Sequence, residues 1–142
     1  MVETPQEEAD IVYRICPTVT NEELNPLFAV SWPEHEWCDF EPVLSRSLTY
    51  ICAFDKGRLI GFVNLAWDGG LPVFLLDPTV HPNGRRRGIG RQLVHRSVMV
   101  AQEPGVEWVH VDFDPPLWDF YRKCGFGSTE AGLIHLDSTS RV

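Results

Sequence analysis

The sequence reads Val80-His81-Pro82-Asn83-Gly84-Arg85-Arg86-Arg87-Gly88-Ile89-Gly90-Arg91 just past its centre. An apolar, strand-like run (residues 73–76) comes shortly before this stretch, and a helix-like pattern runs from residue 88 to about residue 101. Strand, glycine-rich turn and helix start form the geometry in which backbone N–H groups converge on a phosphate. Gly88 and Gly90 remove Cβ atoms that would keep a ligand off the backbone. The stretch therefore predicts an anion site, although a basic, exposed helix start that binds nothing is the alternative.

Four arginines surround the predicted helix start and offer forked donors suited to phosphate: Arg85, Arg86, Arg87 and Arg91. Five of the twelve Lys and Arg residues lie between Arg85 and Arg96, in a chain whose net charge is −8. General nucleic-acid binding needs a basic face, so this balance predicts no nucleic-acid partner. The acidic remainder favours a cationic acceptor such as an amine, or is simply a solvated surface.

Length and composition point to a water-soluble globular chain. A chain of 142 residues suits a single domain, residues 1–142, with a useful core. No apolar run approaches the roughly 20 residues of a membrane span, and the start is no signal peptide, so we expect a cytoplasmic protein without a membrane partner. The four cysteines show no C-x-x-C pairing, and buried thiols are the expected reading.

The remaining elements follow from local patterns. We expect strands at residues 11–15, 48–54, 58–67, 106–113 and 132–136, and a polar terminus at residues 1–9. Thr20 and Glu23 form a capping box, after which Pro26 either kinks the helix or restarts it with Asn25 as cap. Asp39 is expected to cap a second helix with Phe40, Val43 and Leu44 facing inward, and Asp114 to cap a late helix that ends at Gly125.

Two blocks of sequence carry a family resemblance, and together they cover about residues 73–127. Arg85-x-x-Gly88-x-Gly90 matches the pattern R/Q-x-x-G-x-G/A, and Phe120-Tyr121-Arg122-Lys123-Cys124-Gly125-Phe126 matches F-Y-x-x-x-G-F. Both blocks resemble those of the Gcn5-related N-acetyltransferases (GNAT), particularly small bacterial-type members. The resemblance implies an α+β fold with a mixed, mainly antiparallel sheet of six to seven strands. About four helices flank that sheet, and it splays at the acyl-CoA slot.

The resemblance also implies a reaction, the transfer of an acetyl group from acetyl-CoA to a primary amine of a small molecule or peptide. The loop would bind the pyrophosphate through Arg85, Arg86, Arg87, Gly88, Ile89, Gly90 and Arg91. The backbone of Thr79 and Val80 would pair with the pantetheine amides. Tyr121 would protonate the leaving thiolate, because a phenol of pKa about 10 stays protonated at neutral pH. A tyrosine packed in the core is the alternative reading.

The group that deprotonates the amine is the most open of the predictions. Asp77 is the first choice, with Asp112, Glu41 and a water relay without any single base as alternatives. Many family members carry an asparagine after the fifth strand, where this chain has Asp112 and Asp114. Asp114 is therefore predicted either to contact the cofactor or to act only as the helix cap.

An early loop is the predicted acceptor site, because family members usually build that pocket between their first two helices. Trp32, Glu34, Glu36 and Trp37 offer ring faces and carboxylates to a cation, with Trp67 as an addition. The alternative is a set of aromatic residues that only fasten the loop to the core. No metal site is expected, because H-x-D spacing at His110 and Asp112 is weak evidence.

Two other functions stay open at this point. One is a catalytically silent CoA-binding module or sensor, and the other is a nucleic-acid or phosphoprotein binder that uses the arginines. The resemblance also allows a homodimer, which nothing in the sequence shows.

Overall fold

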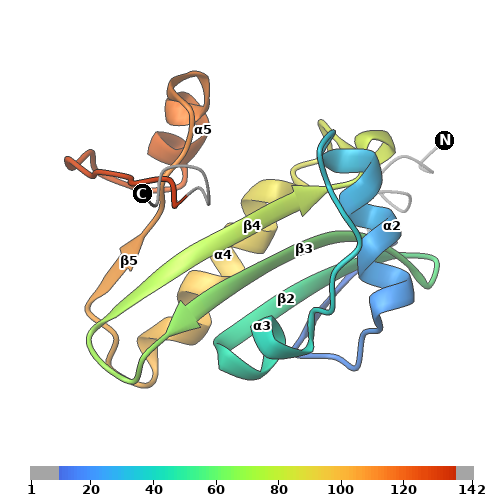
Figure 1. Ribbon diagram of the computed structural model, residues 1–142, viewed down its shortest axis with the longest axis horizontal. Helices are drawn as coiled ribbons and strands as arrows, with labels where there is room; N and C mark the ends of the chain where they lie inside the picture. Colours follow the sequence, from blue (N-terminus) through green and yellow to red (C-terminus); the bar gives the residue numbers. More distant parts are fainter. Residues whose placement is uncertain (1–9, 137–142) are drawn as a thin grey trace, which may run out of the picture. The chain divides into compact units, whose positions relative to one another are not determined.

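Five strands form one sheet in the described part of the chain, residues 10–136 of the computed structural model (Figure 1). Their spatial order follows the sequence: β1 (Ile11–Ile15), β2 (Ser47–Asp55), β3 (Arg58–Trp67), β4 (Pro72–Val80) and β5 (Trp108–His110). The first three pairings are antiparallel and the last, between β4 and β5, is parallel. The helices are α2 (Asn21–Ser31), α3 (Glu41–Arg46), α4 (Ile89–Gln102) and α5 (Trp118–Lys123). The predicted mixed α+β class is confirmed.

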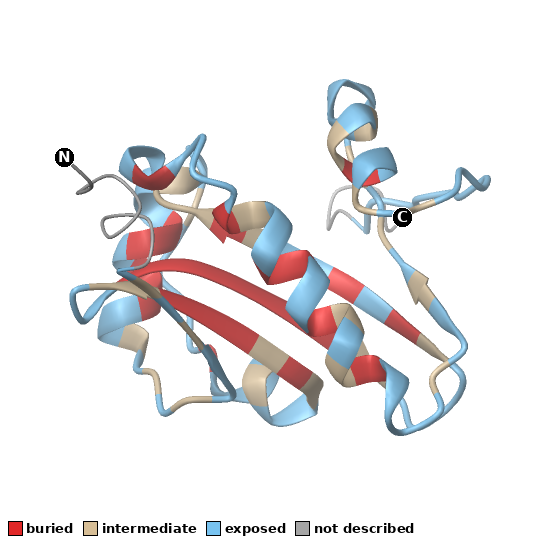
Figure 2. Ribbon diagram, turned by 180° about the vertical axis from the view of Figure 1, so that it is seen from behind, coloured by how far each residue is buried: buried red, intermediate tan, exposed pale blue. Residues whose placement is uncertain are grey.

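Helices cover both faces of the sheet. Helix α4 packs on β2, β3 and β4, while α2 and α3 lie on the opposite face (Figures 1 and 2). The buried side of α4 consists of Ile89, Leu93, Val94, Ser97 and Ala101, which recur at helical spacing as predicted. Gly61 of β3 lets this helix approach, because a Cβ there would lie 3.1 Å from Leu93 Cδ1. A second cluster joins Leu24, Leu27, Phe28, Phe40 and Phe62 on the other face.

Local signals produce the early elements where they were predicted. The capping box of α2 is formed, since the Thr20 side chain accepts from the Glu23 N–H and the Glu23 carboxylate accepts from the Thr20 N–H. Lys56 and Gly57 both have positive φ, the conformation that a two-residue hairpin turn requires between β2 and β3. Helix α2 runs through Pro26 without a restart, so the alternative with Asn25 as a cap is wrong.

Three predicted features differ from the structure. The strand predicted at residues 106–113 is limited to β5, because β4 pairs with it only from Pro72 to Phe74. The strand predicted at residues 132–136 is not formed: Leu133 and Ile134 are 85% and 87% exposed, and high β propensity makes no strand without a partner edge. Hence the described sheet has five strands instead of six or seven. Val43 points outward and is exposed, because α3 is a single short element that buries no side chain fully.

The chain divides into two compact units, Met1–Val111 and Asp112–Val142. The first holds the whole sheet with α2, α3 and α4, and the second holds η2 (Pro115–Leu117) and α5. The polar terminus predicted at residues 1–9 lies outside the described residues, and the single-domain prediction stays a prediction.

Candidate functional site

The glycine-rich stretch forms an open loop between β4 and α4. After the short turn η1 (Pro82–Gly84), Arg86 and Gly88 both adopt left-handed backbone conformations, with φ of +66° and +75°. The first helical bond of α4 runs from the Gln92 N–H to the Gly88 carbonyl, 3.1 Å. The N–H groups of residues 89–91 therefore precede the helical ladder and have no acceptor within it. A Cβ at Gly88 would meet nothing within 4 Å, so the space before these donors is open.

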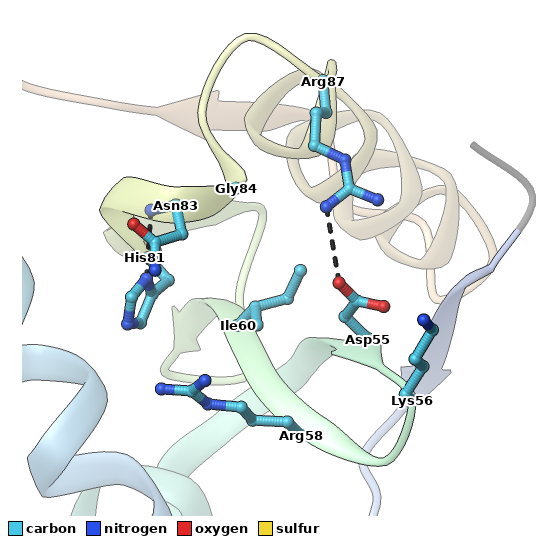
Figure 3. A pocket seen from close by; sticks show the side chains of 8 residues that line it. All are labelled: Asp55, Lys56, Arg58, Ile60, His81, Asn83, Gly84 and Arg87. Carbon is cyan, nitrogen blue, oxygen red and sulfur yellow. Dashed lines mark hydrogen bonds and ion pairs between the residues drawn. The ribbon is translucent and has the colours of Figure 1, made fainter. Parts of the chain in front are cut away.

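Arg87 turns away from this loop and toward the β2–β3 hairpin. Its Nη1 lies 3.4 Å from the Asp55 carboxylate, and both side chains are about one-third exposed (Figure 3). The pair borders a pocket of about 410 Å³ whose other charged or titratable lining residues are Lys56, Arg58 and His81. The contact ties the loop to the sheet, while Arg85, Arg86 and Arg91 stay exposed around the helix start.

The outer edge of β4 has a strand partner over only its first third. Pro72, Val73 and Phe74 pair with β5, and β4 then continues for six residues to Val80 without pairing to any strand on this side among residues 10–136. The family resemblance places pantetheine along this part of β4, at Thr79 and Val80. Thr79 is buried, and its hydroxyl donates to the Asp77 carbonyl at 2.9 Å.

Asp77 occupies a bulge in the same strand. Phe62 pairs with Thr79 and Asn64 with Leu76, so Val63 alone faces both Asp77 and Pro78. Asp77 has φ of +55°, a left-handed conformation that is uncommon for residues other than glycine. Desolvation by the surrounding protein raises the pKa of the Asp77 carboxyl, and the nearby Asn64 amide opposes this rise. The carboxyl still keeps an exposed surface, so a partly desolvated acid stands at an accessible edge.

The segment between α2 and α3 lies against this bulge. The Trp32 indole N–H donates to the Thr79 hydroxyl at 3.0 Å, and the charge of Asp77 contributes to the raised pKa of Cys38. Buried Asn25 holds the segment: its amide nitrogen donates to the carbonyls of Asn21 and Cys38, and its oxygen accepts from the Cys38 N–H and from His35 Nε2. Glu34, Glu36 and Trp37 are exposed along the same segment.

Trp67 does not join that group. It ends β3, five residues beyond Phe62, which at about 3.3 Å per residue is roughly 16 Å along the strand. Its indole N–H donates to the Gly70 carbonyl at 2.7 Å, so this side chain stabilises the turn between β3 and β4. Glu41 is likewise apart from Asp77, at the start of α3 among residues such as Val19 and Ser45.

The second unit places Tyr121 in an aromatic cluster. Its ring stacks on Phe113 at 4.8 Å and meets Phe120 and Phe126 edge-on. Burial, with smaller contributions from Cys124 and Asp112, raises the pKa of Tyr121 to about 12. The helix ends as predicted, with Gly125 at φ +105° and the Phe126 N–H donating to the Tyr121 carbonyl.

Asp114 stands at the predicted cap position, but its side chain makes no capping bond. Its carbonyl instead accepts from the Leu117 N–H at 2.8 Å, which starts η2. The cap prediction is thus correct in position and wrong in mechanism. The carboxylate of Asp114 is exposed and keeps its acceptors for another partner.

The sequence of these elements matches a known family. The model of the acetyltransferase (GNAT) family matches residues 17–126, which is most of the chain and includes parts of both units. The chain belongs to the GNAT family.

Named relatives extend this result. The "Uncharacterized N-acetyltransferase ycf52" of Porphyra purpurea is 24% identical over 102 residues, 69% of this chain and 59% of that protein. The "Probable glucosamine 6-phosphate N-acetyltransferase 2" of Oryza sativa subsp. japonica is 40% identical over 82 residues, 58% of this chain and 46% of that protein. The chain therefore spans about half of the length of these curated relatives.

A solved GNAT structure agrees with the described fold. The GNAT family acetyltransferase of Streptococcus pneumoniae TIGR4 superposes with a TM-score of 0.72 at 25% identity, covering 90% of this chain and 98% of that one. The agreement supports the GNAT fold for this chain.

The residues present suit the acetyl-CoA that the GNAT family implies. Gly88 leaves open space in front of backbone donors, and three exposed arginines flank it. Pyrophosphate, a dianion, is the kind of ligand that helix N-terminal N–H groups and guanidinium groups bind. Among residues 10–136, no group of three His, Cys, Asp or Glu side chains is placed to hold a metal ion. In the same range, no helix is long and apolar enough to cross a membrane.

Sequence reasoning missed two residues that build this region. Asn25 was assigned only as a helix cap, and Asn64 was not singled out at all. The signal for Asn64 was available, because it is the one side-chain amide in the apolar run Leu59–Trp67. A polar residue buried in such a run is normally hydrogen-bonded, and an exception indicates a functional role.

Proposed function

We propose that this GNAT protein is an acetyl-CoA-dependent N-acetyltransferase that acetylates a primary amine by direct transfer. The observation that carries the proposal is the open Gly88 loop at the start of α4, next to the part of β4 that has no strand partner on its outer side. Arg85, Arg86 and Arg91 and the N–H groups of residues 89–91 bind the pyrophosphate. The backbone of Thr79 and Val80 orients the pantetheine arm.

We assign the proton transfers to one carboxyl group and one phenol. When bound, acetyl-CoA supplies a thioester whose carbonyl carbon accepts the amine and whose C–S bond breaks as the C–N bond forms. Asp77 accepts a proton from the substrate ammonium, a role for which a raised pKa is favourable. Tyr121 gives its phenolic proton to the leaving sulfur. The nitrogen loses a second proton on becoming an amide, and this proton restores the phenol through solvent, so atoms and charges balance.

We propose a small-molecule amine as the acceptor, bound along the segment from Trp32 to Trp37. Carboxylates of Glu34 and Glu36 attract its ammonium group, and the exposed ring of Trp37 offers a cation–π face. The rice relative, whose printed name is that of an amino-sugar phosphate acetyltransferase, supports an amino sugar as the first class to test. Trp67 belongs to the far end of β3 and is left out of this site.

The test combines binding with turnover. Calorimetric titration with acetyl-CoA and with CoA lacking its 3′-phosphate measures the cofactor site, and release of free thiol over a panel of amines measures transfer. We expect micromolar binding of acetyl-CoA and thiol release that depends on an amino sugar or another primary amine.

Two results would contradict the proposal in different ways. Absence of binding at millimolar acetyl-CoA would remove the cofactor assignment. Tight binding without turnover on any amine would make the chain a silent CoA-binding module. Cytoplasmic location and homodimer formation stay predictions.

A further inference from the structure

Asn64 is a buried amide without a hydrogen bond. It lies in β3 on the face that carries Phe62, and only 1% of it is exposed. Neither Nδ2 nor Oδ1 has a hydrogen-bond partner among the residues that the structure describes, and no other buried side chain in that range shares this state. Most buried polar groups in proteins are paired, because an unpaired one loses its hydration without replacement. An unpaired amide buried in the middle of a strand therefore suggests a role other than stabilising the fold.

The neighbouring strand, β4, offers a polar partner for this amide. Asn64 faces Leu76, the residue just before the bulge, and the Asn64 amide is close enough to the Asp77 carboxyl to affect its ionisation. Asp77 is held at φ +55° by the same bulge. Thus Asn64 and Asp77 lie on neighbouring strands, in the part of β4 that has no strand partner on its outer side.

We infer that Asn64 is a positioning residue for Asp77: a rotation of the Asp77 side chain brings its carboxylate within hydrogen-bond distance of the otherwise unpaired Asn64 amide N–H, which then fixes the direction of that group at the open end of β4. The inference rests on the proposed function, in which Asp77 takes the proton from the amine. A carboxamide suits this task because it has a donor for the ionised carboxylate and an acceptor for the protonated acid. The Cys38 thiol, in the segment between α2 and α3, is a titratable group near enough to interact electrostatically with Asp77.

The contact also sets the working range of the base. Burial alone favours the neutral acid, whereas a donor favours the ionised form, so Asn64 opposes the rise in the pKa of Asp77 that burial causes. Removing the donor raises the pKa of Asp77 further. Activity that needs ionised Asp77 then begins at higher pH, and the acid limb of kcat/KM moves up.

The experiment uses Asn64→Leu, which has similar branching and no donor, and Asn64→Thr as a variant better suited to a strand. We expect both to move the acid limb of kcat/KM upward, Asn64→Leu by about one pH unit and thus about tenfold in rate below the limb. Carboxyl carbon NMR of the protein without ligands follows the Asp77 titration directly and should show the same shift. Thr49→Val, another buried polar-to-apolar change in the sheet, should leave both readouts unchanged.

Each outcome decides the inference. An unmoved Asp77 titration in both Asn64 variants overturns it, even if turnover falls, because the amide would then be structural only. A shifted titration with a shifted acid limb supports it. A shifted titration in a protein that acetylates no amine supports the Asn64–Asp77 contact and overturns the proposed function instead. In Asp77→Asn protein, adding Asn64→Leu should cause no further change in the pH profile, and an added change would also overturn the inference.

Discussion

Gly88 has two properties that bear on ligand binding. Its φ of +75° is left-handed, and the space that a side chain would take is empty of protein atoms. Gly105, just past the other end of α4, shares both properties at φ +83° but stands away from the arginine loop. Substitutions at Gly88 and Gly105 should therefore cause similar backbone strain, but only a side chain at Gly88 should exclude the ligand.

We predict that Gly88→Val lowers acetyl-CoA affinity at least tenfold, about 1.4 kcal/mol, because the side chain enters the pyrophosphate site. Gly105→Val is the control. Both variants place a bulky residue in a left-handed conformation, at about 1–2 kcal/mol of stability, but only the first loses binding by calorimetry. Unaltered affinity in Gly88→Val would remove the loop assignment.

Tyr121→Phe tests the proton donor. With its pKa raised to about 12, the phenol stays protonated throughout the neutral and mildly alkaline range. We predict a fall in kcat of about 10²-fold with unchanged acetyl-CoA affinity, since general acid catalysis contributes on that order. Tyr50→Phe is the control: it removes a phenol that donates to the Pro17 carbonyl, which costs about 1 kcal/mol of stability and no turnover. Equal kcat in Tyr121→Phe and wild type would make Tyr121 a packing residue.

The same tyrosine gives a stability prediction with a defined sign. Its pKa is higher in the folded protein than the ordinary value of 10.0. The stability that it contributes is therefore fully present below about pH 10 and is lost as the pH rises toward 12. Thermal unfolding of wild type and Tyr121→Phe between pH 8 and pH 12 should show the wild type losing more stability, and parallel curves would contradict this.

At the scale of elements, the segment between α2 and α3 depends on one side chain. Asn25 makes four hydrogen bonds: three join α2 to residues 35 and 38, and the fourth goes to the Asn21 carbonyl within α2. We predict that Asn25→Ala destabilises the protein by about 2–3 kcal/mol, because buried partners lose their bonds. Asn83→Ala, at an exposed position, should change stability by less than about 0.5 kcal/mol. Denaturant unfolding measures the free energy of unfolding of both variants. Similar small effects would show that the segment between α2 and α3 does not depend on Asn25.

Elements with a complete local signal were predictable. The capping box at Thr20, the Lys56–Gly57 turn and the apolar stripe of α4 each carry their cause within a few residues. Strand length is different, because it is set by the partner: residues 106–113 alternate well, but β4 pairs with only three of them. Local sequence could not decide whether α2 continues through Pro26, because that continuity depends on the packing of Leu24, Leu27 and Phe28 on the sheet.

The candidate site divides in the same way. The glycines and arginines of the loop and Tyr121 belong to contiguous motifs, so the sequence alone predicts them. The Arg87–Asp55 pair and the Asn64–Asp77 contact join residues 32 and 13 positions apart, through a sheet register that no local pattern encodes. Asp77 was predicted from its place on the strand, but its bulge was not.

For the whole molecule, charge distribution should affect acceptor capture. Changing Glu34 and Glu36 together to Gln takes the net charge from −8 to −6, as does changing Glu103 and Glu107. We predict that only the first pair raises KM for a cationic amine, about threefold at 0.1 M ionic strength, because exposed charges more than about 10 Å from the bound amine are largely screened there. Steady-state kinetics at two ionic strengths measure it, and equal KM values for both pairs would exclude the segment from the pocket.

The six residues of β4 beyond Phe74 have a consequence for handling the protein. A row of backbone donors and acceptors without a neighbouring strand is a template on which another chain can add, and such edges promote aggregation. If pantetheine occupies this edge, the cofactor also prevents another chain from pairing with β4. Protein kept with CoA should then stay monodisperse at concentrations where the bare chain self-associates, and the amides of residues 75–80 should exchange hydrogen more slowly.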